Sequence, residues 1–153
     1  MAETENLVLE IRRLIKAPRQ RVFDAFTIPE QIVKWIGPKD CDALSAEIDL
    51  RVGGDYRIRI DTDSHGEVEA TGVFREIQRP FRLVYTWRWT DPRLDIGETL
   101  ITVEFVEKNG ETELRFRHEG LPTVEDRDGH NEGWTRSFNK LERLFGEARQ
   151  NRQ

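Results

Sequence analysis

The sequence predicts an α+β fold in which a seven-stranded antiparallel sheet packs on one long C-terminal helix, with two short helices after the first strand. Apolar and polar residues alternate through most of residues 43–118, which is the side-chain period of β-strands. Residues 125–150 contain no proline and carry large apolar side chains at helical spacing. The 153 residues are enough for one hydrophobic core, and we expect residues 1–153 to form a single domain.

The first part of the chain predicts one strand and two short helices. Leu7–Ile15 alternates loosely and is followed by a proline, so we expect the first strand there. Pro18–Thr27 has apolar residues at helical spacing and begins with proline, which suits the start of a helix. Pro29 opens a second helix that runs through Trp35, and the pair Gly37-Pro38 ends it.

Six further segments of alternating residues follow, and turn residues separate them. We expect strands at residues 46–50, 56–60, 67–77, 83–89, 97–106 and 112–118. Gly53-Gly54 is typical of a turn or bulge, and Asn109-Gly110 is a strong signal of a tight hairpin. Strands that are joined largely by hairpins pair antiparallel, so we expect one antiparallel sheet.

The predicted strand at residues 83–89 has the most distinctive pattern. One face carries Leu83, Tyr85, Trp87 and Trp89, and the other carries Val84, Thr86 and Arg88. Three large aromatic side chains in succession exceed what an ordinary sheet face needs, and they favour the wall of a concave pocket. The final helix has an apolar stripe at spacings of four, three and four, formed by Trp134, Phe138, Leu141 and Phe145. Because an antiparallel sheet buries one face, we expect this helix to cover the aromatic face.

The composition argues against several classes of function. The chain has 24 Lys plus Arg and 29 Asp plus Glu, a formal net charge of −5, which is unlike the basic surface of a nucleic-acid-binding protein. No apolar run approaches the roughly 20 residues of a membrane helix, and the first ten residues lack the pattern of a signal peptide. Cys41 has no second cysteine to pair with. We expect a cytoplasmic protein without disulfides, nucleic-acid partners or membrane contacts.

Several short phrases, taken in order, resemble one protein family. They are Ile15-Lys16-Ala17-Pro18, Val22-Phe23-Asp24-Ala25-Phe26, Pro29-Glu30 with Trp35, Asp49-Leu50-Arg51-Val52-Gly53-Gly54-Asp55-Tyr56, Leu83-Val84-Tyr85-Thr86-Trp87 and Gly133-Trp134. Over about residues 7–147 the chain resembles the domain family of the activator of the heat-shock protein 90 ATPase and its homologues, within the START-like (polyketide cyclase-like, SRPBCC) superfamily. The resemblance implies a helix-grip fold, in which a curved antiparallel sheet wraps around a long C-terminal helix and leaves a cavity between them.

The resemblance leaves three classes of function open. Small single-domain relatives resemble carriers or sensors, so the first hypothesis is that the cavity binds a small hydrophobic molecule without catalysis or a cofactor. The second is a stress-related co-chaperone that contacts the heat-shock protein 90 ATPase. The third is an enzyme of the cyclase or hydrolase type that uses the same cavity. A monomer and a homodimer are both compatible with the sequence.

Nine aromatic and histidine side chains are the candidates for the ligand site. They are Trp35, Phe74, Tyr85, Trp87, Trp89, His118, His130, Trp134 and Phe138. We expect Trp35 to act as a lid from the second short helix. His118 ends the inward face of its strand and His130 lies one helical turn before Trp134, so both should face the same space. These histidines are the candidates for acid–base catalysis, and a simpler interpretation makes the whole set core packing with backbone-bonded histidines.

The sequence motifs support neither a metal site nor a catalytic nucleophile. His65 falls in a predicted turn, and the chain contains no HxxxH, HExxH or paired-cysteine spacing. No serine stands in a GxSxG motif. We therefore expect neither a metal site nor a covalent catalytic intermediate.

Overall fold

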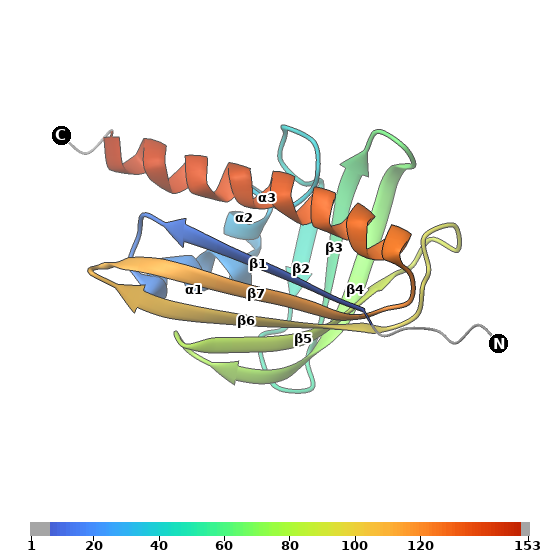
Figure 1. Ribbon diagram of the computed structural model, residues 1–153, viewed down its shortest axis with the longest axis horizontal. Coiled ribbons are helices and arrows are strands. Elements are labelled where there is room, and N and C mark those ends of the chain that lie inside the picture. The colour runs from blue at the N-terminus through green and yellow to red at the C-terminus, as the bar shows by residue number, and fades with distance from the viewer. Residues whose placement is uncertain (1–6, 151–153) are drawn as a thin grey trace.

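The computed structural model describes residues 7–150 and confirms the predicted α+β architecture (Figure 1). The strands are β1 (Leu7–Ile15), β2 (Ser45–Ile48), β3 (Asp55–Thr62), β4 (Gly66–Gln78), β5 (Arg82–Trp89), β6 (Thr99–Lys108) and β7 (Glu111–Leu121). The helices are α1 (Arg19–Thr27), α2 (Pro29–Ile32) and α3 (Val124–Gln150). Every predicted element is present, but α2 is shorter than expected and leaves Trp35 in the turn that follows it.

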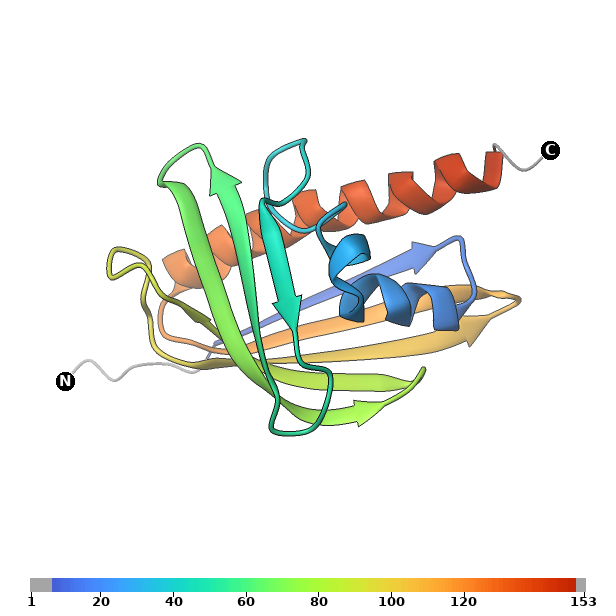
Figure 2. The ribbon, with the colours of Figure 1, turned by 180° about the vertical axis from the view of Figure 1, so that it is seen from behind.

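One sheet contains all seven strands in the order β1-β7-β6-β5-β4-β3-β2, and each neighbouring pair is antiparallel. The strands β2, β3 and β4 run steeply across the direction of β6, β7 and β1, so the sheet is strongly bent (Figures 1 and 2). The helix α3 runs lengthwise beside β1, and the short helices α1 and α2 lie in the angle between the two parts of the sheet (Figure 2). This arrangement is the helix-grip fold.

The bend lies where β4 pairs with β5. The register of the two strands shifts between Phe74 and Glu76, which marks a bulge in β4. Gly72 lets the two backbones approach closely, because a Cβ atom at this position would lie 1.9 Å from the carbonyl oxygen of Thr86. The hydroxyl group of Tyr56 in β3 donates a hydrogen bond to the same carbonyl oxygen at 2.5 Å. Three strands therefore meet at one backbone position.

The close packing at the bend buries part of the outer face of β5. Alternation assigned Val84 and Thr86 to the outer face with Arg88, yet Val84 and Thr86 are buried and only Arg88 is exposed. The hydroxyl oxygen of Thr86 accepts a hydrogen bond from the backbone N–H of Val73 in β4 at 2.8 Å. The approach of β4 thus covers a position that a flat sheet would leave in water.

The hydrophobic core fills the space between the concave face of the sheet and the helices. Its fully buried aromatic members come from α1, from the sheet, from the turn after α2 and from α3, and they are Phe23, Trp35, Phe105, Phe116 and Phe138. Burial of apolar area, at about 25 cal/mol per Å², is the main favourable term that holds these layers together. The aromatic residues of β5 continue this core toward the start of α3.

Candidate functional site

An aromatic cluster joins the end of β5 to the first half of α3. We use this name for Trp87, Trp89, His118, His130 and Trp134. The Trp87 ring lies 5.3 Å from the Trp89 ring and 5.0 Å from the Trp134 ring, measured between centroids, and both pairs meet edge to face. The alternation of β5 and the helical spacing of α3 therefore place the indoles against one another.

His118 connects the sheet to the helix inside the cluster. Its Nδ1 atom accepts a hydrogen bond from the indole N–H of Trp134 at 3.2 Å. The hydroxyl group of Thr99 donates to the carbonyl oxygen of Trp87 at 2.9 Å, so the Nε2–H of His118 donates to the Thr99 oxygen at 2.7 Å. These partners fix one neutral tautomer of His118, with its proton on Nε2.

His130 has the same relation to the other indole, with the opposite tautomer. Its Nε2 atom accepts a hydrogen bond from the indole N–H of Trp89 at 3.0 Å. Its Nδ1–H donates to the backbone carbonyl oxygen of Asp126, one helical turn earlier, at 2.7 Å. The two imidazole rings lie 5.2 Å apart, so the histidines do face the same space.

Burial keeps both imidazoles neutral. Desolvation, together with the neighbouring His130, lowers the pKa of His118 to about 3. Desolvation also lowers the pKa of His130, and the hydrogen bond to the Asp126 carbonyl opposes that shift. All four ring nitrogens have hydrogen-bond partners, so neither histidine has a nitrogen free to exchange a proton with a substrate in this arrangement.

The indole N–H of Trp87 differs from the others, because it has no hydrogen-bond partner although only 4% of the residue is exposed. Among residues 7–150, only one other buried side-chain atom lacks a hydrogen bond, the Oδ1 atom of Asp24, and it lies 2.8 Å from the guanidinium of Arg79. Trp87 therefore holds the one such atom without any polar partner in this part of the chain. The spacing of residues along the sequence does not show which indole lacks an acceptor.

The structure separates the other predicted site residues from the cluster. Trp35 is completely buried, its N–H donates to the carbonyl oxygen of Ala25 at 2.9 Å, and its ring stacks on Phe138. The expectation that Trp35 is a lid is therefore wrong, because the residue has no exposed surface to open. Phe138 packs between Trp35 and Trp134. Phe74 and Tyr85 pack against each other at the bend of the sheet, with ring centroids 6.0 Å apart.

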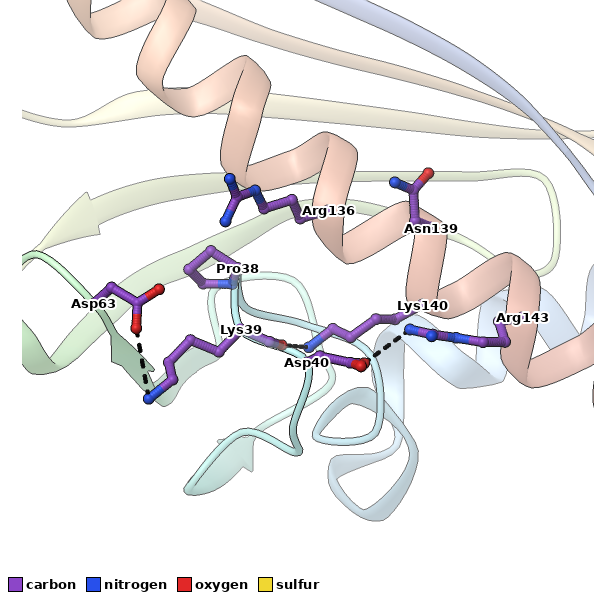
Figure 3. A pocket seen from close by; sticks show the side chains of 8 residues that line it. All are labelled: Pro38, Lys39, Asp40, Asp63, Arg136, Asn139, Lys140 and Arg143. Carbon is purple, nitrogen blue, oxygen red and sulfur yellow. Dashed lines mark hydrogen bonds and ion pairs between the residues drawn. The ribbon is translucent and has the colours of Figure 1, made fainter.

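Where the resemblance implies a cavity, buried aromatic side chains of the sheet and of α3 pack against one another. Two hollows in the described part of the chain lie elsewhere. One, of about 590 Å³, lies between α3 and the loop after α2, near Pro38, Lys140 and Arg143 (Figure 3). The other, of about 650 Å³, lies on the outer face of the sheet near Arg75 and Arg117. A ligand at the aromatic cluster would thus have to displace side chains or part of α3.

The two halves of α3 are held in different ways. In the second half, the ammonium group of Lys140 donates to the carbonyl oxygen of Lys39 at 2.7 Å (Figure 3) and to that of Cys41 at 2.9 Å. Ser137 also bonds to the backbone of Gly37. In the first half, the only side-chain hydrogen bonds to the sheet among the described residues are the two indole–imidazole bonds of the cluster. The first half also contains Gly129 and Gly133, which weaken a helix.

Thr99, Ser137 and Lys140 were not among the predicted site residues. Thr99 could have been found, because it stands opposite Trp87 in the register of β5 and β6. Lys140 lies beside the apolar stripe of α3, three residues after Ser137, and a lysine at such a position gives no signal in the sequence. Burial lowers the pKa of Lys140, and the two carbonyl oxygens stabilise its ammonium group.

No group of histidine, cysteine, aspartate or glutamate side chains within the described range could hold a metal ion. Cys41 is exposed, and His65 lies in the hairpin between β3 and β4, where it contacts Ser64. No helix in residues 7–150 is both long and apolar enough to cross a membrane.

The family description "Activator of Hsp90 ATPase homolog 1-like protein" matches residues 16–146, which is most of the chain. The protein belongs to this family. The resemblance to this family seen in the sequence is therefore confirmed. No curated protein matches the chain.

Solved structures agree with this family assignment. A crystal structure from Chromobacterium violaceum is 28% identical, with a TM-score of 0.79, over 90% of this chain and 96% of its own. A structure from Rhizobium leguminosarum is 25% identical, with a TM-score of 0.77, over 95% of this chain and 97% of its own. DynU16, a protein in the dynemicin biosynthetic locus, is 17% identical over 89% of this chain and 46% of its own, with a TM-score of 0.71, and shares the fold.

Proposed function

We propose that this protein binds a small, largely apolar molecule at the aromatic cluster, between the end of β5 and the first half of α3. The observation that carries the proposal is the uneven anchoring of α3 over this cluster. Three indoles and two neutral imidazoles offer a large apolar contact area with few polar atoms, which is the usual composition of a small-molecule site.

Binding requires the first half of α3 to move away from the sheet while the second half stays in place. The movement breaks the Trp89–His130 and Trp134–His118 hydrogen bonds. Each neutral hydrogen bond contributes about 1 kcal/mol, and water can replace it when the site opens. A ligand that stacks on the exposed rings offsets this loss by burying its own apolar surface, at about 25 cal/mol per Å².

The bonding of the two histidines favours binding over catalysis. A general acid or base needs a ring nitrogen within reach of the substrate and a pKa near the working pH. The nitrogens of His118 and His130 already bond to protein groups, and burial moves the pKa of both away from neutrality. We therefore assign the histidines the role of acceptors that position the indoles.

Titration of the protein with indane, followed by NMR of the four indole N–H groups, tests the proposal. We expect saturable shifts of the Trp87, Trp89 and Trp134 signals, with the Trp35 signal nearly constant because that indole bonds to Ala25 in the core. An Arg136→Ala variant changes the hollow of Figure 3 and not the cluster, so it should keep the affinity of the wild type. Absence of saturation, or loss of the affinity in Arg136→Ala, would refute the proposal.

A further inference from the structure

The four indoles of this protein differ in how their N–H groups are bonded. Trp35 donates to a backbone carbonyl, and Trp89 and Trp134 donate to His130 and His118. Trp87 lies between the last two and, in the described part of the chain, donates to nothing. Two of the three cluster indoles thus have dedicated acceptors supplied by the protein, and the central one has none.

We propose that the indole N–H of Trp87 is the specificity determinant of the site, and that it donates a hydrogen bond to an uncharged oxygen acceptor, such as a ketone carbonyl, on an aromatic ligand. This inference rests on the proposed function and names the ligand class that it takes. It predicts discrimination between molecules of the same shape that differ only in the acceptor.

The unpartnered N–H explains why an acceptor should matter. A buried donor without a partner loses its hydrogen bond to water and gains none from the protein, which is unfavourable. A ligand that offers an oxygen atom at Trp87 removes this unfavourable state, whereas a hydrocarbon of equal size leaves it. A ligand with an acceptor atom at Trp87 should therefore bind more tightly than a hydrocarbon with the same apolar contact area.

The surroundings of Trp87 explain why the acceptor should be uncharged. Its aromatic and imidazole neighbours carry no charge, since both histidines are neutral and burial raises the pKa of Tyr56 well above its ordinary value. The nearest cation in sequence, Arg88, is exposed on the other face and pairs with Asp95. A carboxylate at Trp87 would be buried without a counter-ion, which is strongly unfavourable.

The hydrogen-bonding capacity of the polar neighbours points the same way. His118 and His130 use both ring nitrogens, and the hydroxyl group of Thr99 both accepts from His118 and donates to the carbonyl oxygen of Trp87. A ligand hydroxyl or amine would have to compete with these bonds for an acceptor. The Trp87 N–H, in contrast, has no protein acceptor with which to re-form a hydrogen bond after the site has opened.

The test compares 1-indanone with indane, which differ by a carbonyl group in place of a methylene group. Affinities of both compounds are measured for the wild type and for Trp87→Phe, which removes the N–H and keeps an aromatic ring. We expect Trp87→Phe to raise the Kd of 1-indanone about tenfold more than it raises the Kd of indane, because the variant loses one buried neutral hydrogen bond. The comparison of four affinities cancels the different hydrophobicity of the two compounds.

Trp35→Phe is the matched control, because it removes an indole N–H whose acceptor, Ala25, lies outside the cluster. This variant should leave the ratio of the two affinities as in the wild type. A second measurement needs no variant: the Trp87 N–H signal of the wild type should move downfield with 1-indanone and not with indane.

The outcomes separate the two proposals. Trp87→Phe could weaken the affinities for both compounds equally, or both compounds could shift the Trp87 N–H signal equally. Either result would overturn the role of the Trp87 N–H and leave the proposal of apolar binding at the cluster intact. If neither compound bound the wild type, the proposed function would fail and this inference with it. Should Trp87→Phe not fold, the indole shifts of the wild type decide the question alone.

Discussion

The bonding of single residues gives the aromatic cluster its character. His118 and His130 lie with their rings 5.2 Å apart, and each accepts a hydrogen bond from a different indole. Protonation of either imidazole would turn an acceptor into a donor that faces another donor, and would place a buried charge beside its neighbour. The cluster is therefore stable only while both histidines are neutral.

The stability of the protein should consequently depend on pH in the range where free histidine titrates. The folded pKa of His118 is about 3 and that of His130 is lowered, whereas an unfolded histidine titrates near 6.5. The unfolded state then binds more protons, so the histidine contribution is fully present above about pH 6.5 and is lost as pH falls toward the folded pKa. The slope is up to about 1.4 kcal/mol per pH unit for each histidine.

Urea unfolding at pH 7, 6 and 5 measures this loss. His65→Gln should retain the whole pH dependence, because His65 lies in the hairpin between β3 and β4 and not in the cluster. The carboxylates with lowered pKa, such as Asp91 and Asp95, titrate below this range. A free energy of unfolding that stays constant from pH 7 to pH 5 would contradict the neutral pair.

Thr99 allows a second test at the scale of one atom. Thr99→Val keeps the shape of the side chain but removes the oxygen that accepts from His118 and donates to the carbonyl of Trp87. Loss of these buried bonds should lower the free energy of unfolding by about 1–3 kcal/mol, measured by urea denaturation. The matched control is Thr102→Val in the same strand, which is only half-buried and should change stability by less than about 0.5 kcal/mol. Equal effects of the two substitutions would show that the Thr99 hydroxyl has no special role.

At the scale of elements, α3 combines a fixed half with a weakly held half. The fixed half bonds to the loop after α2 through Ser137, Lys140 and Arg143, and to β1 through Arg13, which bonds to Asn139 and Glu142. The weakly held half begins at a cap in which the Thr123 oxygen accepts from the backbone N–H of Asp126 at 3.0 Å. The cap keeps the first turn helical without fastening it to the sheet, as the proposed movement of this half as a unit requires.

Alanine substitutions should change the free energy of unfolding in opposite directions at the glycines of α3 and at Gly72 in the sheet. A Cβ atom at Gly129 or Gly133 meets nothing within 4 Å, so alanine there should raise the free energy of unfolding by about 0.5–1 kcal/mol through better helix propensity. Alanine at Gly72 must instead push β4 away from the Thr86 carbonyl, 1.9 Å away, and should lower the free energy of unfolding by about 3 kcal/mol or more.

Thermal and urea unfolding of the three alanine variants provide the measurement. Slower hydrogen exchange of the Trp89 and Trp134 indoles in the Gly129→Ala and Gly133→Ala variants would agree with a first half of α3 that opens less often. Destabilisation by alanine at Gly133 would show instead that this position contacts the sheet, against the open space that surrounds it.

Periodicity in the sequence is enough to predict the elements but not how tightly they meet. The alternation of β5 and the stripe of α3 gave the correct strand and helix, because these patterns reflect which side of an element is buried. They placed Thr86 correctly on the outer face but could not show that it is buried there, since alternation contains no information about the bend that Gly72 permits. They also led to the wrong expectation that Trp35 is a lid, because the sequence pattern of a tryptophan after a short helix is the same for a mobile side chain and for a buried one.

The candidate site was predictable in its composition and not in its bonding. Tyr85, Trp87, Trp89, His118, His130 and Trp134 were selected from strand and helix spacing, and the structure brings five of these six into the aromatic cluster. Which indole donates to which histidine depends on side-chain rotamers across three elements. That information is not contained in spacing along one chain, so the free N–H of Trp87 became visible only in three dimensions.

For the whole molecule, the positions of the four tryptophans have an optical consequence. Three lie in the cluster over which α3 would open, and Trp35 is sealed in the core with its N–H bonded to Ala25. The intrinsic fluorescence therefore combines the emission of three tryptophans whose surroundings change when the site opens with that of one tryptophan whose surroundings do not. Without any added dye, the protein contains both the reporter of its own opening and the internal reference against which the signal can be judged.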